Sequence, residues 1–325
     1  MSEKLIKFVE KKNLWFSLSA FMIGIGFVMM GIRVFNSENA LNYGIDFSGG
    51  STMILRFEEL NTNLKQAHSD VERKEMGANF TQRVRNALTG FGLQNSNIQV
   101  AQNGDLIVKT ATMDANKNDR IKNAIQTKIG NFDILELDFI GPTIGSELRA
   151  RSIWIVLLVS SALMLYITWR FELAFGIATL IATLHDALFM VSFAALFNIE
   201  ISVEFIAAIL TIIGYSMNDT VVIFDRIREN LGKLDVPLPT LVNMSLVQTL
   251  SRTFYTVLTT AVMTGCLYLF GGATIKEFSL VLLVGIGIGT YSSLFVAAPA
   301  FALLYKKKVQ QPATTPAATT KSKVR

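Results

Sequence analysis

A single aspartate, Asp219, interrupts a long apolar segment that runs from Phe205 to Phe224. A helix needs roughly 20 residues to cross the hydrocarbon of a membrane, and this segment has that length. A charged side chain at such a depth costs about 3 kcal/mol on insertion scales, so acidic residues in spans usually mark a path for ions or protons. Asp219 is therefore the first candidate for chemistry in this chain, and proton transfer is the chemistry that we expect of it.

Arg252 is the expected partner of Asp219. Asp219 lies about 9 Å inside the boundary marked by Asp225 and Arg226, and Arg252 opens a later apolar segment at a comparable depth. A nearby cation favours the ionised carboxylate whereas desolvation favours the neutral acid, so a movable arginine could switch Asp219 between two protonation states. The plainer alternatives are a static ion pair and an arginine that only extends to the membrane interface. We favour the proton path because carboxylates are rare inside membranes.

His185 and Asp186 make a second possible polar site, in a different apolar segment. His185 lies about 20 Å into its predicted span, counted from Glu172 at helical rise. Histidine titrates near physiological pH and can shuttle protons, but it can equally hydrogen-bond a neighbouring helix, and both alternatives stay open. The adjacent Asp186 favours the proton role slightly. Glu200 and Glu204 lie near the outer ends of their spans, and we expect both to face water.

The elements that must position these residues are long apolar blocks. The chain is 51 % hydrophobic and only 17 % charged, below the roughly 25 % of soluble domains. The first block is longer than the roughly 7–15 residues of a signal-peptide core, so we expect it to be retained. We predict an α-helical integral membrane protein in which a first span is followed by a five-helix bundle, residues 151–304. The predicted spans are 14–35, 152–169, 172–196, 203–224, 253–270 and 279–304.

Lysine and arginine near the span ends predict the orientation. They cluster before the first span, between the fourth and fifth spans and after the sixth, whereas the two short connections on the opposite side carry only Lys276. Because basic residues favour the cytoplasmic side, we expect both termini in the cytoplasm and the long stretch 36–150 outside it. Residues 1–13 are the expected cytoplasmic N-terminus. The tail 305–325, which is rich in Pro, Ala, Thr and Lys, is expected to be disordered.

Cofactor and metal chemistry find no support in the sequence. Cys266 is the one cysteine, and His68 and His185 lie in different regions. The glycines of Gly285–Gly289 stand inside an apolar span without the Lys-Ser/Thr of a phosphate loop, which indicates close helix packing. The basic residues that give a net charge of +5 lie beside the spans and form no nucleic-acid patch. We expect no cofactor and no bound metal, so any energy must come from an ion gradient or a partner.

Residues 36–150 contain the patterns of a water-soluble domain. Alternating apolar residues and the turn at Asn103-Gly104 predict strands over 51–57, 97–100, 106–110 and 132–140. Helical spacing predicts helices over 80–91 and 114–129, whereas 60–76 is expected to be a loop or a short helix. The order βαββαβ predicts an α+β, ferredoxin-like external domain between the first and second spans.

Four short segments beside the spans carry a family resemblance. Just outside the first span, Asp46, Gly49 and Gly50 stand in Tyr43–Gly50, and the others are 141–148, 214–230 and 251–253. They resemble the motifs of the SecF family of the bacterial SecDF protein-export complex, a branch of the resistance-nodulation-division superfamily. The resemblance covers nearly the whole chain except its tail, and the segment 214–230 is its most specific part.

The resemblance implies a partnership and a driving force. A member of the family pairs with SecD in the bacterial inner membrane, which places 36–150 in the periplasm, and uses the proton-motive force to help draw preproteins across after SecA-driven passage through SecYEG. Asp219 and Arg252 match the proton-pathway residues of the family. For Asp46, Gly49 and Gly50 we favour a structural role: a tight turn, a carboxylate that caps backbone N–H groups, and a hinge for the external domain. Substrate contact is the alternative.

We therefore predict a proton-coupled accessory subunit for protein export, not an enzyme. Protons entering from outside would change the charge of Asp219, and its pairing with Arg252 would shift the bundle and swing the external domain. A proton-driven small-molecule exporter of the same superfamily is one alternative, although such exporters usually carry two six-span halves and larger external domains. The second alternative is a scaffold that only stabilises the translocon.

Overall fold

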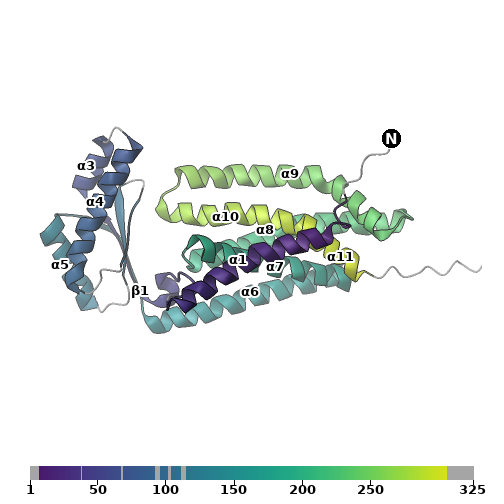
Figure 1. Cartoon of the computed structure of the whole chain (residues 1–325), viewed down its shortest axis with the longest axis horizontal. Helices are drawn as coiled ribbons and strands as arrows, with labels where there is room; N and C mark the ends of the chain where they lie inside the picture. Colours follow the sequence, from purple (N-terminus) through teal and green to yellow (C-terminus); the bar gives the residue numbers. More distant parts are fainter. Residues whose placement is uncertain are drawn as a thin grey trace, which may run out of the picture.

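The computed structural model describes residues 7–37, 39–66, 69–91, 96–101, 104–110 and 115–305. It has two units that lie end to end, a bundle of long helices and a domain of strands and helices that we call the αβ domain, residues 50–140 (Figure 1). Several predictions fall outside the described residues: the start of the N-terminal segment, the first residue of the Asn103-Gly104 turn, Asp114 of a predicted helix, and the tail after residue 305.

In the described part of the chain, six helices are long and apolar enough to cross a membrane. They are α1 (Lys12–Phe35), α6 (Pro142–Arg170), α7 (Leu173–Phe197), α8 (Val203–Lys233), α9 (Leu238–Phe270) and a sixth made of α10 (Ala273–Ser292), the π-helical turn η2 (Ser293–Ala297) and α11 (Ala298–Leu304). This confirms a six-helix membrane protein. The helices α6 and α9 begin well before the predicted spans at 152 and 253. In each, additional helical turns precede the apolar segment, and a proline stands in the first turn, where it is tolerated.

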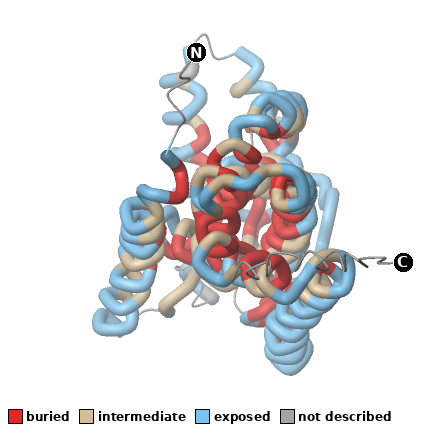
Figure 2. Tube along the Cα trace, turned by 90° about the vertical axis from the view of Figure 1, so that its right-hand side faces the viewer, coloured by how far each residue is buried: buried red, intermediate tan, exposed pale blue. Residues whose placement is uncertain are grey.

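The bundle has three inner and three outer helices. About half of the most apolar stretch is buried in α7 (44 %), α8 (50 %) and the sixth helix (56 %), against 11 % in each of α1, α6 and α9. Viewed along the bundle, buried segments occupy the centre and exposed segments the periphery (Figure 2). The exposed positions of the outer helices are largely apolar, Trp154, Trp169 and Phe270 among them. Such a surface suits lipid or a partner helix rather than water.

Two apolar clusters form the core of the bundle. In the first, the rings of Phe175 and Phe301 stack with centroids 4.1 Å apart and Phe224 packs edge-on against Phe175 at 5.0 Å. The second cluster, which includes Met190 and Ile209, also takes in Phe47 from the short helix α2 (Ile45–Ser48). Along α7, α8 and the sixth helix, several buried polar residues fall between members of the two clusters, among them His185, Asp186, Ser216, Ser292 and Ser293.

The αβ domain is a four-stranded antiparallel sheet with helices on one face. Its strands β1 (Gly50–Arg56), β2 (Asn97–Val100), β3 (Asp105–Thr110) and β4 (Asp133–Ile140) lie in the order β2-β3-β1-β4. Its helices are α3 (Glu58–Gln66), α4 (Asp70–Leu88) and α5 (Ala115–Ile129), with a single 3-10 turn η1 (Thr89–Phe91). Residues 60–76, predicted as a loop or a short helix, lie in α3 and the start of α4. Apolar residues of β1 and β3 pack against the helices, while the opposite face turns toward the bundle.

Gly50, the last residue of the double-glycine motif, is needed for its backbone geometry. Its φ is +150°, which side chains rarely adopt, and a Cβ there would collide with the backbone oxygen of Thr110 on the neighbouring strand. Gly50→Ala is therefore expected to lower the stability of the sheet by about 1–3 kcal/mol.

Hydrogen-exchange protection of the β1 and β3 amides in the full chain measures this loss. The matched control is Gly90→Ala, because a Cβ at Gly90 meets nothing within 4 Å. Equal protection in both variants would contradict a conformational requirement at Gly50.

Candidate functional site

A layer of buried polar side chains crosses the bundle between its two apolar clusters. The side chains come from α1, α7, α8 and the junction of α10 with η2, and each is at most 7 % exposed. They are Ser19, His185, Asp186, Ser216, Thr220, Ser292 and Ser293. Burying polar groups is costly unless they are hydrogen-bonded. This layer is therefore where the bundle could carry out chemistry, and we call it the polar layer.

Asp186 of α7 contacts two other inner helices within the polar layer. Its Oδ2 accepts hydrogen bonds from Ser216 Oγ of α8 at 2.8 Å and from Ser292 Oγ of α10 at 2.9 Å. Its Oδ1 lies 3.1 Å from Nδ1 of the adjacent His185. One carboxylate thus joins three inner helices, and only 1 % of its residue surface is exposed.

His185 extends the polar layer to α1. Its Nε2 lies 3.0 Å from Ser19 Oγ, which in turn lies 3.3 Å from the hydroxyl of Tyr291. The Tyr291 hydroxyl donates to the backbone oxygen of Trp15 at 2.9 Å. His185 therefore does bond a neighbouring helix, and it also lies in a chain of groups that can each pass on a proton. The hydrogen bond to a neighbouring helix is thus observed, and the proton role of His185 stays a prediction.

The sixth helix is deformed beside the polar layer. A π-helical turn begins at Ser293, and such single turns are frequent at functional sites. The glycines of α10 bring it close to α8: a Cβ at Gly285 would collide with Ile212, and one at Gly289 would lie 2.9 Å from the Ser216 side chain. Close packing, predicted for Gly285–Gly289, is confirmed at these two positions. It fails at Gly287, where a Cβ would meet nothing within 4 Å.

Asp219 lies on a different side of α8, facing α9. It is 2 % exposed, and its Oδ1 receives a long hydrogen bond of 3.5 Å from Thr256 of α9. Among the described residues, its Oδ2 has no hydrogen-bond partner although that atom is buried. A buried carboxylate oxygen without a donor is costly to keep ionised, so this position favours binding a proton or a cation.

Arg252 does not form an ion pair with Asp219 within 4.0 Å, among the residues that the structure describes. It lies on α9 one turn before Thr256, and its side chain is exposed, close enough to Asp219 to act on it only through space. Ser216 and Thr220 are buried, but Asn218 is exposed because consecutive helical residues point in different directions.

Asp46 caps the first turn of α8 across a long stretch of sequence. Its Oδ2 accepts a hydrogen bond of 2.9 Å from the backbone N–H of Val203, where α8 begins. A carboxylate at a helix N-terminus is favourable because it faces unpaired N–H groups and the positive end of the helix dipole. Gly49 has a φ of +75°, and a Cβ at Gly145 of α6 would lie 3.0 Å from the Gly49 nitrogen. The motif therefore holds α2 tightly between α6 and α8.

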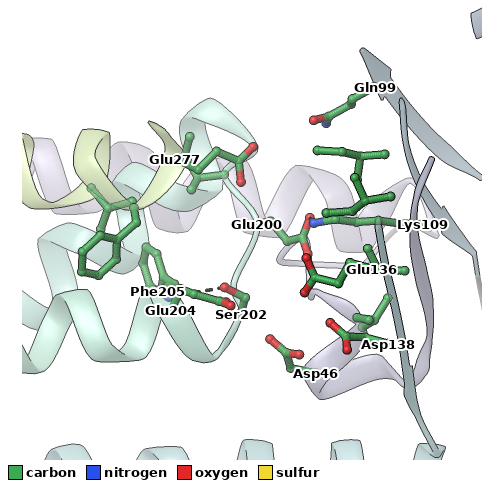
Figure 3. A pocket seen from close by; sticks show the side chains of 17 residues that line it. Asp46, Gln99, Lys109, Glu136, Asp138, Glu200, Ser202, Glu204, Phe205 and Glu277 are labelled. Atoms are coloured by element: carbon green, nitrogen blue, oxygen red, sulfur yellow. Dashed lines mark hydrogen bonds and ion pairs between the residues drawn. The ribbon is translucent and has the colours of Figure 1, made fainter. Parts of the chain in front are cut away.

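Glu200 links the bundle to the αβ domain. Its carboxylate pairs with Lys109 of β3, with Oε2 and Nζ 2.5 Å apart, and only 11 % of its side chain is exposed (Figure 3). A Cβ at Gly44 would lie 2.6 Å from Glu200 Oε1, so this glycine makes room for the carboxylate. Glu200 was expected to face water only, and that expectation is wrong. The cause is its partner, which comes from 91 residues away in the sequence.

A cavity of about 140 Å³ lies around this ion pair, between the sheet and the near end of the bundle. Its lining holds six carboxylates and one lysine, as Figure 3 shows. The carboxylates are Asp46, Glu136, Asp138, Glu200, Glu204 and Glu277. Burial, a hydrogen bond with Asp138 and its negative charge raise the pKa of Glu136 above the ordinary glutamate value. Excess negative charge thus lies at the contact between the two units.

The fold and the polar layer define a class, an α-helical membrane protein with ionisable groups held inside its bundle. A family model described as "Protein export membrane protein SecD/SecF, C-terminal" matches residues 120–307. A second, the "SecD/SecF GG Motif", matches residues 39–59, which include Asp46, Gly49 and Gly50. The chain belongs to the SecF family of SecD/SecF protein-export membrane proteins.

Relatives and solved structures agree over most of the chain. The chain is 34 % identical to the "Protein translocase subunit SecF" of Sebaldella termitidis over 94 % of each chain, and 36 % identical to that of Borreliella burgdorferi over 94 % of this chain and 99 % of that one. The crystal structure of SecDF from Thermus thermophilus, a "translocon-associated membrane protein", superposes with a TM-score of 0.75 at 30 % identity. A super-membrane-facing form gives 0.62. Both matches cover 93 % of this chain, which spans 39 % of each solved chain.

Sequence reasoning missed the hydroxyl partners of the polar layer. Ser19, Ser216 and Ser292 each contact Asp186 or His185 from another helix. One usable signal was present, because the glycine-rich spacing of α10 marks the face that packs against α8.

Proposed function

We propose that this chain is the SecF subunit of a Sec protein translocase and that it uses the proton-motive force to promote a late stage of preprotein translocation. Membership of the SecF family supports the translocase role. The observation that carries the proton role is Asp219, a buried carboxylate with one unpaired oxygen inside a membrane helix.

The proposal includes partners and an orientation. SecD is the expected partner, because the chain matches 39 % of a solved chain that is titled SecDF. SecYEG, SecA and the translocating preprotein are expected to meet the complex. The basic residues at the α11 end of the bundle favour placing both termini in the cytoplasm and the αβ domain in the periplasm of the inner membrane. We interpret the αβ domain as a ferredoxin-like sandwich, since its strand order β2-β3-β1-β4 is antiparallel throughout.

Asp219 and Arg252 are the proposed proton-pathway residues. In the arrangement described, Arg252 is exposed on α9 and Asp219 has room for a proton. Loss of that proton leaves a buried carboxylate, which then attracts Arg252 across the turn that separates it from Thr256. One charge moving through the membrane potential is worth about 2.3 kcal/mol per 100 mV, enough to bias a two-state bundle. The proton thereby does work by changing which helices are held together.

The helix α8 is the proposed link to the αβ domain. It carries Asp219 in its middle, and its first residue, Val203, is held by Asp46 beside the glycine motif. The loop before it carries Glu200, which pairs with Lys109 of the sheet. The distance along α8 from Val203 to Asp219 is about 24 Å at helical rise. A tilt of α8 would therefore move both attachments of the αβ domain together.

A protonophore tests the proposed function. Inverted membrane vesicles that contain this chain and its SecD partner should complete preprotein translocation faster than vesicles without the chain, provided that a proton gradient is present. Because the gradient supplies the work, collapsing it at constant ATP should reduce the rate to that of vesicles without the chain. Stimulation that survives the protonophore would favour the scaffold alternative instead.

A further inference from the structure

We propose that Asp186 is a second protonation site of the bundle, and that its charge state decides whether α7, α8 and α10 are held together at the polar layer. This rests on the proposed proton coupling and extends it to a group that lies on another side of α8 from Asp219. The proposal stands on the geometry of three hydroxyls around one carboxylate and one backbone oxygen.

The ionised state of Asp186 ties three helices to one oxygen atom. Ser216 of α8 and Ser292 of α10 both donate to Oδ2 of Asp186 on α7, at 2.8 and 2.9 Å. Hydrogen bonds to a charged acceptor are roughly twice as strong as neutral ones, so two such bonds from different helices resist sliding between them. The ionised carboxylate therefore holds α7, α8 and α10 together at the level where the two apolar clusters meet.

When Asp186 is neutral, the surrounding hydroxyls also have hydrogen-bond acceptors within reach. Gly289 O lies 3.3 Å from Ser216 Oγ and 3.0 Å from Ser292 Oγ, so both hydroxyls have a second acceptor within reach. The same oxygen already accepts from Ser293 at 2.9 Å. A proton that binds Oδ2 turns it into a donor to Ser216 Oγ. Ser216 can then donate to Ser292 Oγ at 3.4 Å, and Ser292 donates to Gly289 O. Neither state leaves a buried hydroxyl unpaired, so neither state has the cost of an unsatisfied buried polar group.

A proton on Asp186 or on His185 is what can balance the negative charge of Asp186 among its described contacts. His185 from its own helix is the one titratable group in direct contact. Tyr291 of α10 lies beyond Ser19, while α1 and α8 present hydroxyls at this site. No lysine or arginine of the described residues forms an ion pair with Asp186. In the proposed step, the Asp186 carboxylate gains one proton from the outer side and shares it with His185 Nδ1. It later loses this proton to the cytoplasmic side. Only O–H and N–H bonds form and break.

The deformation of the sixth helix shows what would move. The π-helical turn η2 begins directly after Ser292, at the residues whose hydroxyls bond Gly289 O. A π turn replaces the regular i→i+4 hydrogen bonds with i→i+5 bonds, and such turns are frequent at functional sites. Release of Ser292 from Asp186 would therefore free α10 at the point where its geometry is already altered.

Infrared difference spectroscopy of the full chain in liposomes tests this proposal, because a protonated carboxyl has its own C=O stretch. On titration, Asp186→Asn should remove one component of this band, and Asp219→Asn should remove another. Ser216→Ala and Ser292→Ala each delete a donor to the carboxylate, so the Asp186 component should persist to a pH about one unit higher. Ser160→Ala is the matched control, since this buried serine bonds only to Val156 of its own helix.

The outcomes separate this proposal from the proposed function. A band that is identical in wild type and Asp186→Asn at every pH would overturn the second site, as would a band that responds to sodium but not to pH. If Asp186→Asn does not insert into the membrane, the two serine variants still test the proposal, because both keep the carboxylate. An unchanged titration midpoint of the carboxyl band in both variants would overturn the proposal. Protonophore-resistant export with a normal Asp186 titration would overturn the proposed function alone.

Discussion

Replacement of Asp219 by asparagine is expected to abolish the gradient-dependent part of preprotein export and to leave the ATP-driven part unchanged. Asparagine has nearly the shape of the neutral acid, so it can keep the contact with Thr256 of α9. It cannot lose a proton, however, and the bundle would stay permanently in its protonated arrangement. Because the change removes a buried, partly unpaired charge rather than a packing group, insertion and stability should be unaffected or improved.

Asp225→Asn is the control for this variant. It makes the same chemical change on the same helix, but Asp225 is 58 % exposed and pairs with Arg228 at 2.9 Å, a surface interaction worth about 0–1 kcal/mol. Inverted vesicles with each variant would be compared with and without a protonophore, and co-purification with SecD would report assembly. Gradient-dependent export at the wild-type level in assembled Asp219→Asn complexes would rule out this carboxylate as the proton carrier.

The membrane helices could be predicted because a helix that crosses lipid needs about 20 mostly apolar residues, which hydropathy detects. The six apolar blocks all lie in long helices, and alternation together with the turn at residue 104 indicated the strands of the αβ domain. The ends of helices could not be predicted in the same way. The helix α9 begins at Leu238 rather than near 253, since its first turns mix apolar and polar residues, and hydropathy does not report helicity outside the hydrocarbon.

The candidate site could be predicted only in its titratable members. Asp186 and Asp219 stand out because a buried acid is costly wherever it lies in the membrane. Their partners depend on how helices rotate and pack, which leaves little trace in one sequence. Asn218 points outward one residue before Asp219, and Glu200 finds Lys109 in a separate domain. Long-range pairs of this kind need the tertiary structure.

A reversible chemical cross-link between positions 109 and 200, where Lys109 contacts Glu200, is expected to stop gradient-dependent export almost completely. If α8 drives the αβ domain through this contact, the domain must be able to separate from the bundle or tilt on it during each cycle. The two charged groups lie 2.5 Å apart at the ends of long side chains, so cysteines at both positions suit a short bifunctional thiol reagent rather than a direct disulfide. Cys266, which is exposed, must first be replaced by alanine.

The same reagent supplies its own controls. A cysteine pair at Glu59 and Arg83, which form an ion pair of 2.9 Å inside the αβ domain, would be linked equally without tying that domain to the bundle. Export should survive this second link, and cleavage of a reducible linker should restore export in the first pair. Simple loss of the Lys109–Glu200 ion pair, as in Lys109→Gln, should lower export less than the link does, because Asp46 still holds the first turn of α8. Undiminished gradient-dependent export with the two units covalently joined would mean that work reaches the preprotein by a route other than movement of the αβ domain.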